Sequence, residues 1–224
     1  MISKKHQCVF IHIPKTAGTS IEKKLGHFEE LTFGAQDHRT LQEIKENTNR
    51  ILHLKKSLYT AKRGNYNRII PHLRNAIDPE ITATQFKTYY KFTFVRNSWT
   101  RVFSYYTMVM KDDFFHKKKY QMDVTPLSFK EFVKQKIDVK HLSQLRYIET
   151  NRGMNDIDFI GRFENLKEDF AHVCDTLGIP DSTLPKLNSY PYRDYREVYD
   201  KETKDLVYKL FKEEIDYFKF EFDT

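Results

Sequence analysis

The 224-residue sequence contains little cysteine and glycine and no long apolar run. Its two cysteines, Cys8 and Cys174, lie far apart without metal-ligand spacing, which favours buried thiols in a reducing compartment over a disulfide or a zinc site. No stretch approaches the roughly 20 apolar residues that span a bilayer, and no signal peptide or anchor is recognisable. Repeats, low-complexity tracts and Gly/Ser linkers are also missing. We therefore expect a single domain over residues 1–224 with one sizeable core.

Basic residues outnumber acidic ones by 38 to 31, which gives a formal net charge of +7. This balance favours anionic partners such as nucleotides, acidic glycans, nucleic acids or membrane surfaces, without choosing among them. The basic region 50–90 has apolar residues at helical spacing, at 51, 54 and 58 and again at 69, 73 and 77. Its charges are typical of solvated helix faces, although some could receive an acidic substrate. No RNP-like, KH or zinc-finger pattern accompanies them, so nucleic acid is disfavoured as a partner.

Near the start of the chain, a predicted strand, a loop and a helix follow one another directly. Residues 9–13 are β-branched and aromatic, and the run stops at Pro14, which cannot donate to a ladder. Ile21 and Leu25 then have the four-residue spacing of a helix that packs back onto a sheet. The N–H groups and the positive dipole end of this helix face the loop, so we expect the loop to bind a phosphate-type anion. The alternative is an ordinary turn with a solvated lysine.

The loop combines one cation with hydroxyls and a glycine: Lys15, Thr16, Ala17, Gly18, Thr19 and Ser20. It is not a standard nucleotide-triphosphate loop, because Lys15 precedes Gly18, whereas the standard motif places its lysine after the second glycine. A lysine on the strand side can instead reach an oxygen that bridges two anionic groups.

A second strand and helix carry an arginine at their junction. Residues 92–95 read as a buried strand, and the aromatic and aliphatic residues of 99–106 have helical spacing. Arg96 follows the strand directly, where open α/β sheets bind ligands, and its planar fork suits a phosphate monoester. Ser104 lies about two turns into the helix and could face the same anion. The alternative is a buried structural arginine with a core serine. Arg101 is expected to brace nearby carbonyls or carboxylates.

Together, the loop and the pair of Arg96 and Ser104 resemble the two anion-binding motifs of sulfotransferases that use 3'-phosphoadenosine-5'-phosphosulfate (PAPS). The resemblance is closest to the membrane-associated carbohydrate sulfotransferases and their bacterial relatives, and it extends over residues 9–222. In that family the loop holds the 5'-phosphosulfate, and the Arg and Ser hold the 3'-phosphate. The sequence departs from the family's common Arg-Asp-Pro by carrying Arg96-Asn97-Ser98, and Ser98 is expected to cap the helix in place of the proline.

The resemblance also implies catalytic roles. His38 stands in a polar turn before a helix that begins near Thr40, and it matches an H-x-T pattern whose histidine is the general base. An imidazole with its ordinary pKa of about 6.5 can accept a hydroxyl proton near neutrality. Lys15 would stabilise charge on the departing phosphate oxygen. Glu22 is the next carboxylate to consider, although a solvated or capping role suits it better.

Further contacts are implied downstream. Phe163 matches an aromatic residue near the adenine, with a core phenylalanine as the alternative, and Arg193 and Tyr195 match a loop that closes over the nucleotide. Gln144 matches a glutamine of the acceptor site. His141, off the usual family spacing, is the other expected acceptor contact.

The expected fold is α/β, a three-layer P-loop-like arrangement with a mostly parallel central sheet flanked by helices. Further elements are expected as a strand from residue 159 and helices over 128–136, 166–177 and 201–218. The absence of an anchor, which eukaryotic members usually carry, indicates a cytoplasmic bacterial protein or a trimmed form of an anchored one.

The expected function is metal-free transfer of a sulfuryl group from PAPS to a hydroxyl of a small-molecule or glycan acceptor, with 3'-phosphoadenosine 5'-phosphate as the product. A carbohydrate is favoured, and an acidic one is among the options. The oligomeric state is unknown from sequence. A P-loop kinase is disfavoured because the loop lacks the Gly-Lys-[ST] ending. A non-catalytic nucleotide- or glycan-binding module stays open if His38 points away from the phosphosulfate.

Overall fold

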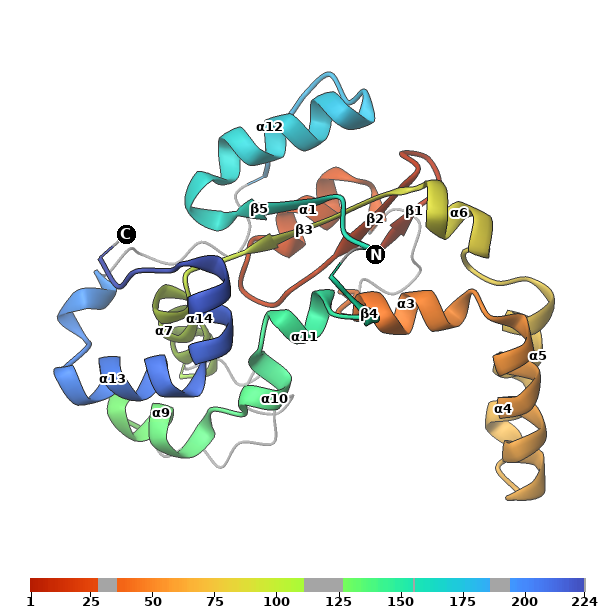
Figure 1. Cartoon of the computed structure of the whole chain (residues 1–224), viewed down its shortest axis with the longest axis horizontal. Coiled ribbons are helices and arrows are strands. Elements are labelled where there is room, and N and C mark those ends of the chain that lie inside the picture. The colour runs from red at the N-terminus through yellow and green to blue at the C-terminus, as the bar shows by residue number, and fades with distance from the viewer. Residues whose placement is uncertain (28–35, 111–126, 155, 186–193, 224) are drawn as a thin grey trace.

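The computed structural model describes residues 1–27, 36–110, 127–154, 156–185 and 194–223. Its four-stranded sheet has the order β1-β2-β3-β5, in which β1 is antiparallel to β2 and the other neighbours are parallel (Figure 1). The strands are β1 (Ile2–Ser3), β2 (Cys8–Ile11), β3 (Tyr90–Val95) and β5 (Phe159–Arg162), with the short β4 (Asn151–Met154) outside the sheet. The longer helices are α1 (Gly18–Lys24), α3 (Leu41–Asn47), α4 (Arg50–Lys62), α5 (Ile69–Ile77), α6 (Ala83–Thr88), α7 (Ser98–Val109), α9 (Phe129–Lys136), α12 (Leu166–Leu177), α13 (Lys201–Leu210) and α14 (Lys212–Phe218). Short helices are η1 (Tyr66–Arg68), α10 (Val139–Leu142), α11 (Leu145–Ile148), η2 (Phe163–Asn165) and η3 (Tyr195–Glu197).

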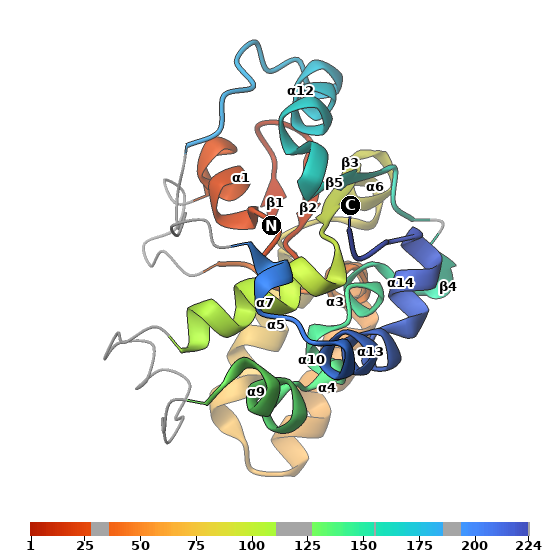
Figure 2. The same ribbon diagram turned by 90° about the vertical axis from the view of Figure 1, so that its left-hand side faces the viewer.

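Helices cover both faces of the sheet. Side chains alternate along a strand, so Phe10 of β2 and Phe94 of β3 face α1 and α12, while Val9 and Ile11 face the opposite layer. That second layer contains α3, α7, α13 and α14, and the two views of the ribbon agree on the arrangement (Figures 1 and 2). The predicted three-layer α/β fold with a mostly parallel sheet is confirmed.

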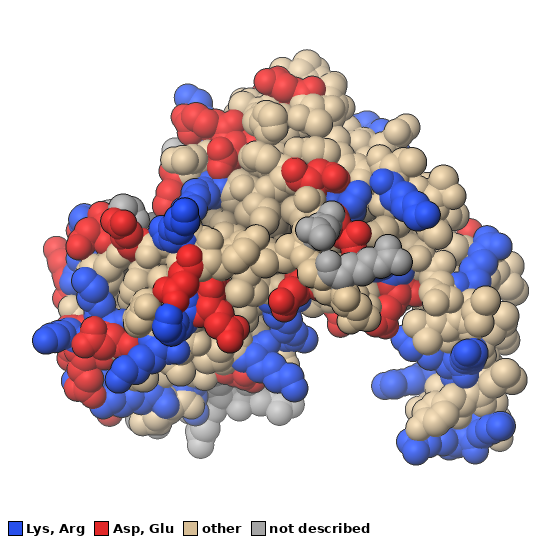
Figure 3. All heavy atoms as spheres, viewed as in Figure 1, with Lys and Arg blue, Asp and Glu red and all other residues tan. Residues whose placement is uncertain are grey.

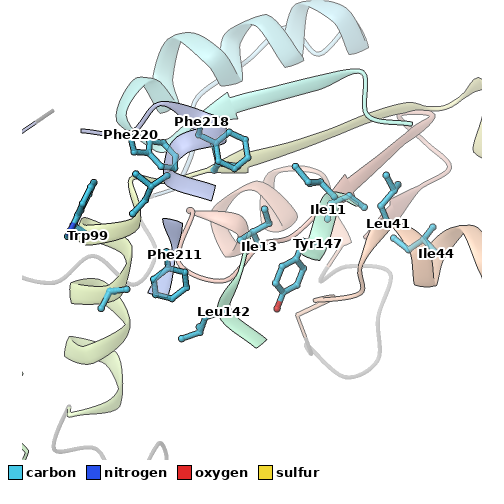
Figure 4. Close-up of a cluster of buried hydrophobic side chains, with 14 of the residues drawn as sticks. Ile11, Ile13, Leu41, Ile44, Trp99, Leu142, Tyr147, Phe211, Phe218 and Phe220 are labelled. Atoms are coloured by element: carbon cyan, nitrogen blue, oxygen red, sulfur yellow. The ribbon is translucent and has the colours of Figure 1, made fainter. Parts of the chain in front are cut away.

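The larger hydrophobic cluster joins segments that are distant in sequence (Figure 4). Ile11 and Leu41 lie at one end of it, and Trp99, Phe211 and Phe218 lie toward the other. The helix predicted over 201–218 is in fact two helices, α13 and α14, which are separated at Phe211. Phe211 is only 2 % exposed, so the break between the two helices lies in the core. No glycine or proline stands there to predict it.

Side-chain caps set several helix starts. Thr40 before α3 and Ser128 before α9 each form a capping box, in which the N-cap hydroxyl and a glutamate three residues later satisfy each other's backbone N–H groups. At α7 the cap is Asn97, which accepts from the Trp99 N–H, and the expectation that Ser98 would cap this helix is wrong. Within the described ranges, no helix has the length and apolarity needed to cross a membrane.

Candidate functional site

The loop between β2 and α1 has an unusual backbone. Lys15 and Ala17 have positive φ values of 73° and 66°, a region that residues with a Cβ seldom adopt. Each such residue costs on the order of 1 kcal/mol, so the surrounding structure must hold the loop in this shape. Thr16 contributes to this, because its fully buried hydroxyl donates to the Ile13 carbonyl at 2.8 Å. Thr16 thus shapes the loop from within.

A glycine is required where the loop enters α1. A Cβ at Gly18 would lie 1.9 Å from Cδ2 of the His12 ring, far inside van der Waals contact. Ala17 is the N-cap of α1 but supplies no side-chain cap, so no side chain bonds the first turn of this helix from the cap position. Thr19 accepts a hydrogen bond from the Gln36 amide at 2.6 Å, and Ser20 is buried.

Arg96 connects the second motif to this loop. Its Nη1 donates to the Lys15 carbonyl at 3.3 Å, and its Nε donates to the Thr100 hydroxyl at 3.0 Å. The guanidinium carbon lies 4.1 Å from the centroid of the Phe163 ring. Ser104, which is half-buried, follows Thr100 by four residues and therefore lies one turn further along the same face of α7.

The three elements meet because their strands are neighbours. The Lys15 loop follows β2, Arg96 follows β3, and Phe163 follows β5, and these strands are adjacent and parallel in the sheet. The carboxyl ends of adjacent parallel strands lie at one edge, where open α/β sheets bind ligands. The structure therefore brings Lys15, Arg96 and Phe163 together at this edge, as the sequence predicts.

Buried polar groups hold the backbone of Arg96 in position. The side-chain amide of Gln144 accepts from the Arg96 N–H at 2.8 Å and donates to the Arg96 carbonyl at 2.9 Å. Gln144 is fully buried, and it also donates to the Glu214 carboxylate through its own N–H at 2.6 Å. Gln144 therefore holds the Arg96 backbone in place. The buried environment of the Gln144 side chain differs from the contact with an acceptor that the sequence leads us to expect.

Glu214 is a buried carboxylate that sequence reasoning missed. It accepts from the Ser98 hydroxyl at 2.6 Å and pairs with the Arg101 guanidinium at 3.4 Å. Arg101 also donates to the Leu142 carbonyl, which confirms its expected bracing role. The glutamate lies in an amphipathic C-terminal stretch where acidic residues are common, so its burial has no local signal in the sequence.

His38 lies beside the Lys15 loop. Its Nδ1 is 3.1 Å from the His12 carbonyl oxygen, and its Nε2 is 3.0 Å from the Gln36 side-chain oxygen. The His38 and His12 rings lie 4.3 Å apart between centroids, and the His12 ring in turn packs against Gly18. His38 is thus connected to the loop through two residues: Gln36, which bonds Thr19, and His12, which packs against Gly18.

These contacts determine where a neutral His38 holds its proton. A backbone carbonyl can only accept, so Nδ1 carries the hydrogen and Nε2 keeps a lone pair. With this tautomer, the Gln36 amide must turn its nitrogen to Nε2 and its oxygen to the Thr19 hydroxyl, which is the reverse of the orientation described above. Burial, followed by the charge of neighbouring His12, lowers the pKa of His38. Both effects favour the neutral ring over the charged one.

His12 and Glu22 form a buried pair behind the loop. His12 Nδ1 is 3.0 Å from Glu22 Oε1, and both side chains are buried. Burial alone would raise the pKa of Glu22, but His12 and the Asp37 N–H outweigh it, and the pKa is lowered. Glu22 is thus a charged, buried group and not a solvated one. Sequence reasoning missed His12 because a histidine within an apolar strand run resembles a core residue.

Two of the remaining predicted site residues have other partners, and a third lies outside the residues that the structure describes. Tyr195 is buried among aromatic rings, and its hydroxyl donates to the Phe222 carbonyl. His141 is exposed, with Nδ1 at 2.5 Å from Asp138. Arg193 lies outside the described residues. Among the residues that the structure describes, no group of three or more His, Cys, Asp or Glu side chains could hold a metal ion.

Comparisons with known proteins agree with the motifs. A model of the sulfotransferase family matches residues 1–221. An uncharacterized protein of Archaeoglobus fulgidus is 32 % identical over 127 residues, which cover 56 % of this chain and 95 % of the relative. No solved structure matches the chain.

Proposed function

Since this chain belongs to the sulfotransferase family, we propose that it transfers a sulfuryl group from PAPS to a hydroxyl of a carbohydrate acceptor by in-line displacement. Sulfuryl transfer in general follows from the family, and the choice of donor and acceptor is the proposal. The observation that supports it most is the meeting of Lys15, Arg96 and Phe163 at the carboxyl edge of three adjacent strands.

The residues of this edge suit a nucleotide with two separate anionic groups. The Lys15 loop would hold the 5'-phosphosulfate, and Arg96 with Ser104 would hold the 3'-phosphate. Arg96 is already oriented by Thr100, by the Phe163 ring and by the Gln144 amide on its backbone. A guanidinium held in this way loses little freedom on binding a phosphate, and such charge-assisted bonds are among the strongest in proteins.

One residue receives the proton of the hydroxyl, and another stabilises the negative charge that develops on the leaving group. The acceptor oxygen bonds to sulfur as the bond from sulfur to the phosphate oxygen breaks, and the hydroxyl proton passes to Nε2 of His38. The negative charge left on the phosphate oxygen is stabilised by the Lys15 ammonium, a preorganised electrostatic contribution of the kind that often dominates catalysis. The carbonyl of His12 keeps the Nδ1 hydrogen in place, so that Nε2 is the basic atom.

Calorimetric titration tests the donor. The product 3'-phosphoadenosine 5'-phosphate should bind far more tightly than ADP, because only the former has a 3'-phosphate for Arg96. Arg96→Ala should weaken its binding tenfold or more, which corresponds to the loss of a charge-assisted hydrogen bond of about 1.5–3 kcal/mol. ADP binding should change little in this variant, and Arg146→Ala, at an exposed site, serves as the matched control. Equal affinity of the unaltered protein for the two nucleotides would exclude the proposed donor.

A transfer assay tests the acceptor class. Radiolabelled PAPS is incubated with the protein and with panels of glycans, phenols, steroids and peptides, and the labelled products are separated. We expect label on glycans, and the panel includes acidic as well as neutral glycans. Label found only on phenols or peptides would contradict the carbohydrate assignment while leaving the donor assignment intact.

A further inference from the structure

The helices α4 and α5 form a hairpin that projects from the rest of the molecule (Figure 1). We call residues 50–77 the arm. The two helices pack mainly on each other, through buried His53 and Ser57 of α4 and Ala76 of α5. The base of the arm follows α3, where Lys56 lies 3.6 Å from Glu46. The arm is therefore a separate surface with its own composition.

Large apolar side chains of the arm are exposed to solvent. Ile70 and Ile77 are 74 % and 75 % exposed, and Ile51 and Leu58 are each 66 % exposed, whereas aliphatic side chains of this size are usually buried. The exposed large hydrophobic residues of the arm are Ile51, Leu54, Leu58, Tyr59, Tyr66, Ile70, Leu73 and Ile77. A concentration of this kind marks an interaction surface.

These residues form one stripe on each helix. The residues at 51, 54 and 58 in α4 and at 70, 73 and 77 in α5 share the spacing i, i+3, i+7, which places each set on one face. Each stripe lies roughly a quarter to a third of a turn from the buried positions of its helix, in the same rotational sense. Because the helices of a hairpin are antiparallel, this rotation turns both stripes toward the same side. The arm thus presents one broad apolar face.

The arm also carries the net charge of the protein. Residues 50–77 contain seven Lys and Arg and no Asp or Glu, and the remaining 31 basic residues equal the 31 acidic residues of the chain. The arm shows only basic and uncharged side chains on the face visible in Figure 3. Lys55, Lys62 and Arg74 are exposed and flank the stripes on the helical circumference. The apolar face is therefore bordered by positive charge.

We propose that the arm docks this protein on the surface of an anionic lipid membrane. An apolar face bordered by Lys and Arg matches a bilayer surface, where acyl chains receive the aliphatic residues and anionic headgroups attract the cations. Tyr59 and Tyr66, near the turn of the hairpin, suit the headgroup level, where tyrosine is enriched. A second copy of the chain fits less well, because two arms of like charge repel each other.

Vesicle co-sedimentation tests the proposal with the full chain and without any sulfotransferase assay. The protein should pellet with vesicles of phosphatidylcholine mixed with phosphatidylglycerol and much less with phosphatidylcholine alone, and salt should weaken the binding. Ile70→Ser with Ile77→Ser should lower the partition coefficient of the protein between water and the vesicles about tenfold or more, because two exposed aliphatic side chains no longer enter the bilayer. Lys55→Glu with Lys62→Glu should remove the preference for anionic lipid.

Matched controls separate the arm from the rest of the surface. Tyr217→Ser and Lys209→Glu alter an exposed apolar and an exposed basic residue outside the arm, and both should bind vesicles like the unaltered protein. Circular dichroism checks that every variant is folded. The proposal is overturned if neither vesicle pellets the protein, or if the controls lose binding as the arm variants do. It is also overturned if the serine variants abolish a dimer formed without lipid and leave vesicle binding unchanged, which would assign the face to a second copy.

Discussion

His38 is surrounded by groups that leave only one of its ring nitrogens available as a base. The carbonyl of His12 fixes the hydrogen on Nδ1, and Nε2 meets a side-chain amide that an acceptor hydroxyl can replace. The His12 carbonyl, in contrast, can only accept a hydrogen bond, so it keeps the hydrogen on Nδ1. The direction of proton transfer is thus set by one backbone atom, three residues before Lys15.

Replacing His38 by alanine should lower turnover by about 10²- to 10⁴-fold and leave the affinity for 3'-phosphoadenosine 5'-phosphate nearly unchanged, because a general base acts on the acceptor. Steady-state kinetics and calorimetry measure the two quantities. In the unaltered protein, kcat/KM should fall on the acid side with a midpoint below the ordinary histidine value of about 6.5. The sign follows from the lowered pKa of His38, since the neutral, active form then persists to lower pH.

His141→Ala is the matched control for this prediction, because the His141 side chain is exposed and its ring pairs with Asp138, three residues earlier in the chain. Its turnover and its acid midpoint should equal those of the unaltered protein. Lys15→Ala should differ from both, with loss of turnover and a modest loss of nucleotide affinity, because the lysine charge meets the donor before and during the reaction. Unaltered turnover in the His38 variant would remove this residue from the reaction.

At the level of elements, the site depends on how closely α1 and the Lys15 loop approach His12, the residue that follows β2. Gly18→Ala would place a methyl group against the His12 ring, while Gly161→Ala would place one 2.5 Å from the Phe94 ring in the sheet. Both should lower the free energy of unfolding by about 1–3 kcal/mol, as measured by urea denaturation. Only Gly18→Ala should also weaken nucleotide binding, by tenfold or more, because it displaces the loop. Equal nucleotide affinities in the two variants would contradict a ligand-binding role for the loop.

The elements that the sequence predicts correctly are those with local signals. The strand at β2 and its loop are visible as an apolar run ended by Pro14, and α12 ends at Gly178, which adopts the left-handed conformation. The same local signals led to Lys15 and Arg96, whose meeting follows from the parallel order of β2 and β3. Their roles in binding PAPS stay predictions, as does the single domain.

What the sequence does not predict depends on contacts over long separations. Gln144 bonds the backbone of Arg96 from 48 residues away, and Glu214 bonds Gln144 from a further 70 residues. No periodicity or motif connects such positions, so a buried positioning glutamine resembles a glutamine that faces an acceptor. The pair of His12 and Glu22 is missed for a related reason, because the two residues can be recognised as a pair only when both are known to be buried side by side.

At the level of the whole molecule, a body with balanced charge carries a basic arm. The apolar stripes of the arm already lie in solvent, so they contribute little to the stability of the folded chain. Ile70→Ser with Ile77→Ser should therefore change the free energy of unfolding by no more than about 0.5 kcal/mol per substitution. Phe10→Ala, at a fully buried ring between the sheet and α1, should cost about 3–5 kcal/mol. Urea denaturation compares the two, and a large loss in the serine variant would show that the arm is part of the core.

The bonds of Gln144 and Glu214 to the region of Arg96 also have a consequence for the order in which the site is completed during synthesis. Arg96 emerges early, but Gln144 follows it by 48 residues and Glu214 by a further 70. At about 5–20 residues per second, Gln144 is made roughly 2 to 10 s after Arg96, and Glu214 roughly 6 to 24 s after it. The nascent chain therefore contains the Lys15 loop and Arg96 well before it contains α14, whose Glu214 bonds the Gln144 that holds the Arg96 backbone. Nucleotide binding should begin only when α14 has been made and has docked.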